Sequence, residues 1–139
     1  MIIEKLQPQY VQQAVVLQQQ IVPCTIDPEY AAAHYETMFL REDCCVFTAR
    51  EGDELLGTVS GFCCPALGGN YLVIEDLIVS EKLRGGGIGT SLMSAVEEFG
   101  RQTRCDYAIF VSSGFRKRAH HFYRKIGYTE DVRGFRKDL

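Results

Sequence analysis

The sequence predicts a mixed α/β fold in which one sheet carries helices on both faces. Two observations predict it. Short segments rich in β-branched and aromatic residues recur along the chain, and between them apolar residues return at helical spacing. In chain order the elements are β-α-α-β-β-β-α-β-α-β, with a further strand at the end. At 139 residues we expect one domain spanning residues 1–139, large enough for a buried core.

Composition and charge are those of an ordinary globular protein. Hydrophobic residues make up 46% of the chain and charged residues 24%, with a formal net charge of -3 and a pI of about 5.6. The acidic balance argues against a nucleic-acid-binding surface. Residues 1–5 do not form a signal peptide, and no apolar run reaches membrane-spanning length. We therefore expect a cytoplasmic protein.

The six cysteines are predicted to be reduced thiols. None are spaced as C-x-x-C, and the adjacent pairs Cys44-Cys45 and Cys63-Cys64 lie in expected strands, where neighbours point to opposite faces. The other two are Cys24 and Cys105. No metal site is therefore expected, and thiols that pack as small apolar side chains are the better interpretation.

The N-terminal elements are a strand and two helices. Residues 1–6 are the strand, and Pro8 suits the first turn of a helix that Pro23 ends. Asp27 is a candidate N-cap for the second helix, with Pro28 at its first position. The apolar face of the first helix comprises Val11, Ala14, Val15, Leu17 and Ile21, with glutamines on its wet side. That of the second comprises Tyr30, Ala33, His34, Met38 and Leu40. His34 is either a substrate-site group or an ordinary surface or core histidine.

The middle of the chain predicts a hairpin followed by a central strand. Residues 44–49 and 55–64 pair through a tight turn at 51–54. Gly57 and Gly61 mark close backbone approaches or bulges. Residues 65–70 form a loop that leads to the strand 71–79.

The C-terminal part predicts a helix, a buried strand and a second helix. The first helix has the apolar face Ile88, Leu92, Ala95, Val96 and Phe99. Residues 106–111 form the strand, a turn follows at 112–114, and the last helix spans 116–126, with Gly127 at its C-cap. Residues 128–139 form two short strands or one bent strand.

Residues 71–93 read YLVIEDLIVSEKLRGGGIGTSLM, a strand, a glycine-rich turn and a helix start. Such a turn presents free backbone N–H groups and the positive end of a helix dipole to an anion. Glycines adopt dihedral angles that side chains forbid and let the backbone approach a ligand. The sequence therefore predicts a phosphate site at residues 84–90.

Three phosphate-binding patterns compete for this turn. A P-loop needs a Lys before Thr90, and a dinucleotide fingerprint needs Gly at position 90 or 92; neither is present. The pattern [RQ]-x-x-G-x-[GA] fits residues 84–89 at every position. With the preceding Leu77-Ile78-Val79, the stretch resembles the acetyl-CoA-binding motif of the GNAT superfamily of N-acetyltransferases. The alternative is a glycine-rich loop that only lets a helix pack close to a strand.

The resemblance implies a GNAT-like fold and acetyl-CoA as the acetyl donor. That fold is of the α/β (α+β) class, with a mixed, mostly antiparallel central sheet of six to seven strands flanked by about four helices. Its central strand and the next one splay apart to admit the pantetheine arm. The cofactor-binding residues that it implies are Leu77, Ile78 and Val79, and, around the pyrophosphate, Arg84, Gly85, Gly86, Gly87, Ile88, Gly89 and Thr90.

A second stretch, AHHFYRKIGY at residues 119–128, resembles the family signature A-x-x-F-Y-x-x-x-G-[FY]. By that match Tyr123 is similar to the tyrosine that protonates the departing CoA thiolate, a role in which a positioned acid contributes about 10²–10⁴-fold. The alternative is a packing aromatic. Many members carry Asn near the start of this helix to touch the cofactor; here Ser112 and Ser113 occupy that turn, and Ser113 is the candidate contact. The basic run on this helix and its two histidines, His120 and His121, are expected to face solvent.

An amine acceptor must lose a proton before it attacks a thioester. Glu75 is the candidate base, with Asp76 beside it; on a strand the two point to opposite faces, so at most one lines the acceptor cleft. Residues 74–77 resemble a strand of polyamine-type acetyltransferases in which the acidic residue is the base. Partial desolvation would raise the pKa of such a carboxylate toward a useful range. Binding of a cationic substrate and a water chain acting as base are the alternatives.

The sequence thus predicts an acetyl-CoA-dependent N-acetyltransferase that moves an acetyl group directly to a primary amine of a small molecule or peptide. A non-catalytic acyl-CoA-binding or sensing module is the alternative, and a nucleotide-binding switch is a third reading. The expected partner is the amine substrate, with no nucleic acid and no membrane; a homodimer is common in this superfamily. Polyamine, aminoglycoside, amino acid and protein amines all remain open as acceptors.

Overall fold

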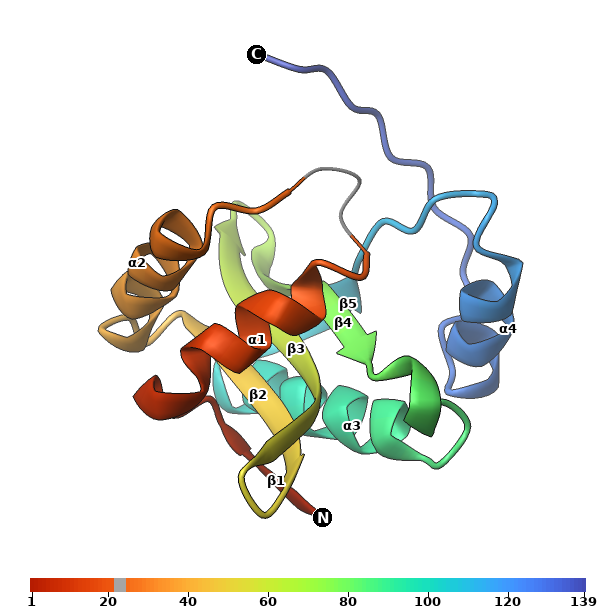
Figure 1. Cartoon of the computed structure of the whole chain (residues 1–139). Coiled ribbons are helices and arrows are strands. Elements are labelled where there is room, and N and C mark those ends of the chain that lie inside the picture. Colours follow the sequence, from red (N-terminus) through yellow and green to blue (C-terminus); the bar gives the residue numbers. More distant parts are fainter. Residues whose placement is uncertain (22–24) are drawn as a thin grey trace. The chain divides into compact units, whose positions relative to one another are not determined.

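The computed structural model describes residues 1–21 and 25–139, which form two compact units, Met1–Ile109 and Phe110–Leu139. Figure 1 follows the chain through both. The first unit contains the sheet and helices α1 to α3, and the second contains α4. Pro23 and Cys24, which we expected to end a helix and to carry a reduced thiol, lie outside the described residues.

The sheet has five strands in chain order, β1-β2-β3-β4-β5. Each strand is antiparallel to the one before it, except that β5 runs parallel to β4. The bounds are β1 (Ile2–Lys5), β2 (Cys44–Glu51), β3 (Glu54–Ala66), β4 (Gly69–Val79) and β5 (Cys105–Ile109). The predicted mixed, mostly antiparallel sheet is confirmed, with five strands in the described residues instead of six to seven.

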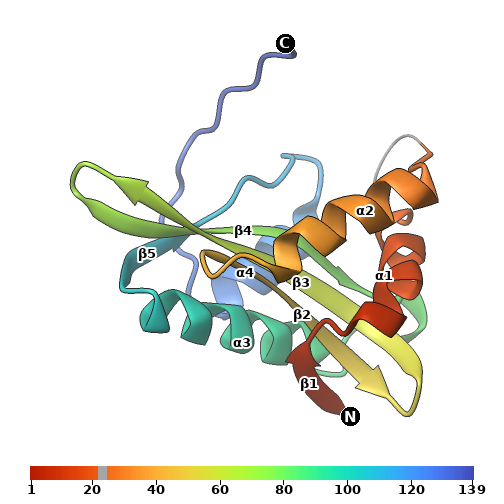
Figure 2. The same cartoon turned by 90° about the vertical axis from the view of Figure 1, so that its left-hand side faces the viewer.

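Helices cover both faces of this sheet, as predicted. Helices α1 (Val11–Gln18) and α2 (Pro28–Phe39) lie on one face, and α3 (Ile88–Gln102) lies on the other (Figure 2). Helix α1 packs over β3 and β4, whereas α3 crosses β2 to β5. Ile78 of β4 joins the core formed with α1, and Leu92 and Val96 of α3 are fully buried.

Glycines in β3 let α3 and β4 approach it closely. A Cβ at Gly61 would lie 2.4 Å from Val96 Cγ2, and one at Gly57 would lie 2.6 Å from the carbonyl oxygen of Ile78. Both distances are shorter than real Cβ contacts allow. The predicted close backbone approaches at Gly57 and Gly61 are therefore confirmed.

Helix α1 begins after a 3₁₀ turn, η1 (Pro8–Tyr10), and ends earlier than expected. The backbone N–H groups of Gln20 and Ile21 bond three residues back, to the carbonyls of Leu17 and Gln18. This tighter pattern is typical of a helix that is closing, so α1 ends at Gln18 before any proline intervenes.

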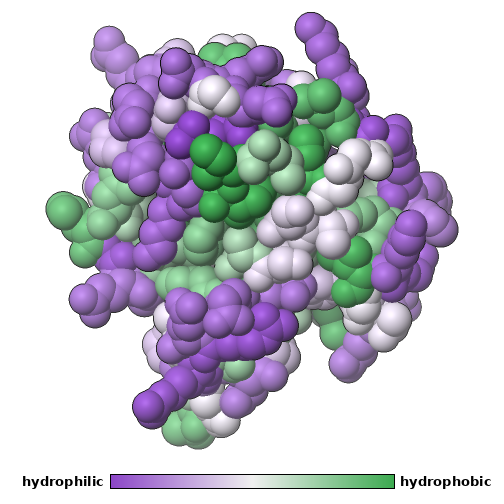
Figure 3. All heavy atoms as spheres, turned by 90° about the horizontal axis from the view of Figure 1, so that it is seen from below, coloured by the Kyte–Doolittle hydropathy of each residue, from purple (hydrophilic) through white to green (hydrophobic). Residues whose placement is uncertain are grey.

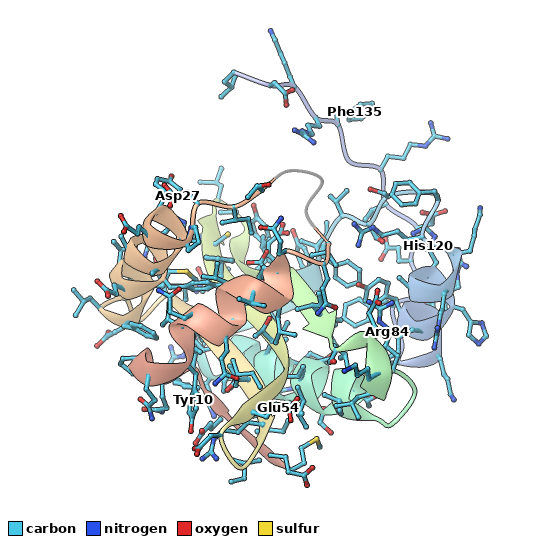
Figure 4. The ribbon with its side chains drawn as sticks, in the orientation of Figure 1. Tyr10, Asp27, Glu54, Arg84, His120 and Phe135 are labelled. Atoms are coloured by element: carbon cyan, nitrogen blue, oxygen red, sulfur yellow. The ribbon has the colours of Figure 1, made fainter. Side chains whose placement is uncertain are left out.

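Helix α2 starts where the sequence predicts but buries a different face. The Asp27 carboxylate accepts a hydrogen bond from the Glu29 backbone N–H at 3.0 Å, which confirms the N-cap (Figure 4). Of the predicted apolar face only Met38 packs against the core, whereas Tyr30 is 71% exposed and Leu40 is 90% exposed. Tyr35 is buried in their place, and Ala31, Ala32 and Met38 pack beside it. Two apolar stripes of equal period existed in this helix, and packing against the sheet selected the second.

The expected loop at residues 65–70 is instead the end of a long hairpin. Pro65 pairs with Asn70 and Ala66 with Gly69, so β3 and β4 turn directly through Leu67 and Gly68. Gly69 has a φ of +130°, which suits glycine.

The strand predicted at residues 106–111 is present as β5, but its predicted burial and the predicted strands at residues 128–139 are wrong. Strand β5 is not buried, since Asp106 and Tyr107 are exposed. Residues 128–139 form no helix or strand, and Phe135 is 96% exposed. In an extended segment Val132 would share its side with Arg136, and Phe135 would share its side with Arg133 and Lys137, so neither side could present an apolar stripe to a core.

Helix α4 (Lys117–Lys125) ends as predicted at Gly127, whose φ is +106°. The N–H of Gly127 bonds to the Arg124 carbonyl, and the N–H of Tyr128 bonds to the Tyr123 carbonyl. This pair of bonds is a Schellman motif, which satisfies the last carbonyls of the helix.

No helix in the described part of the chain has the length and apolarity that crossing a bilayer requires. A space-filling view shows hydrophobic residues gathered toward the middle of one face with hydrophilic residues around them (Figure 3).

Candidate active site

The glycine turn joins the end of β4 to the start of α3. After Val79 a short 3₁₀ helix, η2 (Glu81–Leu83), leads to Arg84 and the three glycines. Gly85 and Gly87 have φ values of +97° and +82°, which other residues adopt only with strain. Gly87 is the N-cap of α3, and the first helical N–H groups, from Ile88 to Thr90, have no acceptor within a helix. The turn therefore has the backbone geometry of an anion site.

Arg84 is held beside this turn. Its Nε lies 3.4 Å from the carbonyl oxygen of Val79, and its Nη2 lies 3.5 Å from the Glu81 carboxylate. Figure 4 labels the side chain next to the turn that precedes α3. Both contacts are long and the side chain is 39% exposed, so the guanidinium can exchange them for a stronger anionic partner.

The second half of β4 continues beyond its pairing with β5. The last paired residues are Val73 and Ile109, and β4 runs on to Val79. Within the residues that the structure describes, Ile78 and Val79 pair with β3, Leu77 lies in the register shift before them, and none of the three pairs with β5. One edge of this segment therefore has backbone groups turned away from the β3 ladder, next to the glycine turn.

Strand β4 contains a bulge at Asp76. Thr58 pairs with Ile78 and Ser60 with Glu75, so β4 has one residue more than β3 over this interval. Asp76 adopts a φ of +55°, which is uncommon for a residue with a side chain. Such strain persists only where surrounding contacts hold it.

Three hydrogen bonds hold the bulge. The backbone carbonyl of Asp76 accepts from Gln18 Nε2 at 3.0 Å and from Thr58 Oγ1 at 3.3 Å. The Asp76 carboxylate accepts from Ser60 Oγ at 3.1 Å. The strained residue is thus bonded to both α1 and β3.

The bulge places Glu75 and Asp76 on the same face of the sheet, which corrects the predicted alternation. Glu75 lies opposite Ser60, and paired residues share a face. Ser60 in turn bonds to the Asp76 carboxylate. A bulge inserts one residue and breaks the period of two, so both carboxylates lie on the face that α1 and α2 cover.

Both carboxylates have raised pKa values although solvent reaches them. Burial raises the pKa of Glu75, and the negative charge of Asp76 raises it further. Burial also raises the pKa of Asp76, against the opposing effects of the Ser60 hydrogen bond and the His34 charge. Both side chains are nevertheless exposed by surface area. A carboxylate that solvent reaches but protein largely surrounds is suited to act as a base.

Helix α2 contributes two further groups near Asp76. Tyr35 is buried, and its pKa is raised by burial and by the charge of Asp76. His34 is exposed, stacks on Tyr30 with ring centroids 6.1 Å apart, and lowers the pKa of Asp76. Sequence reasoning named His34 but missed Tyr35, because the wrong stripe of α2 was assigned to the core.

Gln18 was also missed. It was assigned to the wet side of α1, but it is 5% exposed, and its Nε2 donates to Thr58 Oγ1 at 2.7 Å. A signal was present: Gln18 follows Val11 by seven residues and Ala14 by four, which places it on the buried stripe.

The second unit contains the remaining candidates. Tyr123 on α4 is half-buried, with its ring centroid 4.4 Å from that of Phe110 and 5.4 Å from that of Phe122. Ser113 is exposed, and its carbonyl accepts from the Arg116 N–H at 3.0 Å. His121 is exposed, whereas His120 is half-buried. Glu75, Leu77–Val79 and the glycine turn therefore lie in the first unit, and Tyr123 and Ser113 in the second.

The described cysteines are free thiols, and in the described ranges 1–21 and 25–139 no three His, Cys, Asp or Glu side chains form a cluster that could hold a metal ion. Cys44 and Cys45 are buried, and burial raises the pKa of Cys45 to about 12.

Solved structures share this fold over nearly the whole chain. A transcriptional regulator from Bacillus halodurans C-125 superposes with a TM-score of 0.90 at 19% identity, covering 99% of both chains. Glucosamine-6-phosphate N-acetyltransferase from Arabidopsis thaliana gives 0.85 at 19% identity, covering 99% of this chain and 97% of the other. The aminoglycoside N-acetyltransferase AAC(6')-Iy in complex with CoA gives 0.84 at 18% identity, covering 99% and 95%. At these identities the likeness shows the fold alone.

No curated protein matches the sequence in a direct search. A family model does: that of the acetyltransferase (GNAT) family matches residues 10–128, most of the chain and parts of both units. The match confirms the resemblance drawn from the glycine turn and the second signature. The chain belongs to the acetyltransferase (GNAT) family.

Proposed function

We propose that the protein is an N-acetyltransferase that transfers the acetyl group of acetyl-CoA directly to a primary amine. The observation that carries this proposal is the glycine turn at residues 84–90, which opens α3 next to the free edge of β4. Its positive φ values and unpaired helical N–H groups fit a pyrophosphate. Nothing lies within 4 Å of a Cβ built at Gly85 or Gly87, so the turn is open to a ligand. The CoA in the AAC(6')-Iy structure supports the choice of donor.

In this proposal the donor lies along β4. The backbone of Leu77, Ile78 and Val79 bonds to the pantetheine arm, as a strand edge bonds to an extended chain. Arg84 and the amides from Gly85 to Thr90 hold the pyrophosphate, and Ser113 supplies a further contact. The family match crosses the boundary between the two units, which supports one acetyltransferase domain over residues 1–139.

Two side chains carry the proton transfers. Glu75 takes a proton from the acceptor ammonium, and its raised pKa suits that step. The amine nitrogen then attacks the thioester carbonyl carbon, an N–C bond forms, and the C–S bond breaks. Tyr123 gives its phenolic proton to the departing thiolate, and the second proton that the acylated nitrogen loses restores the phenol. The acetyl group does not pass through an enzyme side chain.

The acceptor is proposed to be a cationic amine on a small molecule or peptide. Two carboxylates on one face, Glu75 and Asp76, attract an ammonium group. The named activities of the structural neighbours, on an amino sugar phosphate and on aminoglycosides, are compatible with this choice. Free thiols are typical of a reducing compartment and support a cytoplasmic location. A homodimer is part of the proposal, and sedimentation velocity would test it.

A non-catalytic acyl-CoA sensor is the second candidate. It is favoured by one neighbour of high structural similarity that is described as a transcriptional regulator. A sensor needs the glycine turn but not the raised pKa of Glu75 or the phenol of Tyr123.

The deciding experiment measures CoA release from acetyl-CoA by chromatography across a panel of amines, with Tyr123→Phe alongside. Chromatography avoids a thiol reagent that would react with the cysteines. We expect turnover with one class of amine, and in the variant a kcat lower by about 10²–10⁴-fold with unchanged acetyl-CoA affinity. Binding without turnover on any amine would favour the sensor, and absence of acetyl-CoA binding would refute both candidates.

A further inference from the structure

The strongest unexplained feature of the first unit is the buried amide of Gln18. Its side chain is 5% exposed, at the last position of α1, on a stripe that is otherwise apolar. Its Oε1 is buried and has no hydrogen-bond partner among the described residues. A buried acceptor without a partner destabilises the folded state. An apolar residue of similar size would avoid that cost. We therefore look for the role of this amide in the bonds of its nitrogen, Nε2.

That other end bonds to the bulge. Gln18 Nε2 lies 2.7 Å from Thr58 Oγ1 and 3.0 Å from the carbonyl oxygen of Asp76. Thr58 Oγ1 lies 3.3 Å from the same carbonyl. The Gln18 amide, Thr58 Oγ1 and the Asp76 carbonyl are therefore mutually bonded, and Asp76 is the one non-glycine residue of β4 with positive φ.

The bulge matters to the site because it puts two carboxylates on one face. With regular alternation Asp76 would point toward α3, away from Glu75. No side chain of α1 other than Gln18 carries a donor to Asp76 among the described contacts, and α1 contains no charged residue. The position of the carboxylate pair depends on this bond together with those from Thr58 and Ser60.

We propose that Gln18 is a positioning residue for the acetyl transfer: through the Asp76 carbonyl it holds the bulge that sets Glu75 and Asp76 side by side. The proposal rests on the proposed function for its catalytic consequence. Gln18 itself does not touch the substrate, since its free oxygen is buried. It acts through Asp76, and through Asp76 on the orientation of the base.

The test compares Gln18→Met with Gln13→Met. Methionine keeps the length of glutamine and removes its donors and acceptor. Gln13 lies on the same helix and also joins it to the sheet, donating to the Asp53 carbonyl at 2.8 Å and accepting from the Leu55 N–H at 3.0 Å. The Gln13 variant thus also removes two hydrogen bonds between α1 and the sheet, but at a site away from the bulge. It controls for a general weakening of the contact between α1 and the sheet.

Two readouts are needed. The first is the intraresidue nuclear Overhauser effect between the amide and α protons of Asp76, which is strong for a positive φ and weak for extended backbone. We expect it to be strong in the wild type and in Gln13→Met, and weak in Gln18→Met. The second is turnover: we expect kcat to fall about 10²-fold in Gln18→Met, as for a catalytic group displaced by about 1 Å, with the KM for acetyl-CoA unchanged.

A strong intraresidue Overhauser effect at Asp76 in Gln18→Met would overturn the proposal. Loss of that Overhauser effect with an undiminished kcat would overturn it too. If the wild type turned over no amine, the proposed function would fail and the catalytic role of Gln18 with it. The spectroscopic readout would still decide whether Gln18 holds the bulge, which distinguishes the two failures.

Discussion

The two faces of the same pair of strands, β3 and β4, are built in opposite ways. On the face toward α3, glycines bring the sheet against Leu92 and Val96, and the contact is apolar and fully buried. On the face toward α1 and α2, Thr58 and Ser60 are fully buried but polar, and they bond to the strained Asp76. Alternation along the strands allows both, because successive residues serve different faces.

The difference teaches how a small domain supports a strained site. The α3 face gains stability from close packing without a polar group that needs a partner. The α1 and α2 face carries an uncommon φ, an unpaired amide oxygen and two carboxylates with raised pKa values. Each of these features costs stability, and residues that bear such costs tend to cluster at functional sites.

The largest expected effect is on catalysis, at the face of β3 and β4 toward α1 and α2, here called the polar face. Glu75→Gln removes the base while preserving size and hydrogen bonding, so kcat should fall by about 10²–10⁴-fold. Steady-state kinetics with the amine identified by the panel would measure it. Unfolding of this variant in urea should show no loss of stability, because burial and the Asp76 charge disfavour the ionised carboxylate that the substitution removes. An unchanged kcat would assign the base to Asp76 or to water.

On the face of β3 and β4 toward α3, here called the apolar face, the largest expected effect is on stability. Gly57→Ala places a Cβ 2.6 Å from a backbone oxygen and 3.0 Å from Leu92 Cδ1, and the backbone cannot give way as a side chain would. We expect the free energy of unfolding to fall by about 1–3 kcal/mol, measured by urea denaturation. Gly68→Ala is the matched control, since nothing lies within 4 Å of its Cβ. Equal stability of the two variants would show that β4 and α3 do not pack against Gly57 as closely as described.

A smaller effect links the polar face to pH. The folded-state pKa of Asp76 is raised, so the folded state binds more protons than the unfolded state above the ordinary pKa of 3.8. The stability associated with this group is therefore fully present below that pH and is lost as the pH rises through the raised value.

Asp76→Asn removes this dependence. The stability of the variant minus that of the wild type should be larger at pH 7.5 than at pH 4. Thermal unfolding of both proteins at both pH values would measure it. Glu75, Tyr35 and His34 are the other titratable groups in range, and all remain in the variant. Glu130→Gln, at an exposed position of the second unit, is the control. A stability difference of the opposite sign would mean that Asp76 is stabilised as a charge.

The smallest effect concerns the helix that covers the polar face. Asp27→Ala removes the N-cap bond to Glu29 and should cost about 1 kcal/mol of α2 stability. Hydrogen exchange should show the loss of protection within α2 and leave α3 unchanged, because the bond that is removed joins two residues at the start of α2. Equal loss of protection in both helices would indicate that the two faces unfold together.

Local chemistry in the sequence was enough for much of this molecule. The glycine turn, the N-cap at Asp27, the C-cap at Gly127 and the close approaches at Gly57 and Gly61 each follow from one residue type with one conformational property. The mixed sheet with helices on both faces follows from periodicity, and its mostly antiparallel order from the family resemblance. The family motif lies within one continuous stretch, so it too can be read without a structure.

Tertiary structure decided what periodicity leaves open. It selected Tyr35 over Tyr30 as the buried face of α2, since two stripes had the same period and only the sheet distinguishes them. It left residues 128–139 without strands, because an extended segment needs a partner that its own sequence does not name. Above all, it set the bulge at Asp76. A bulge is a mismatch in length between two paired strands, here β3 and β4, and a side chain of α1, Gln18, bonds to it. It therefore cannot be predicted from any single segment of the sequence.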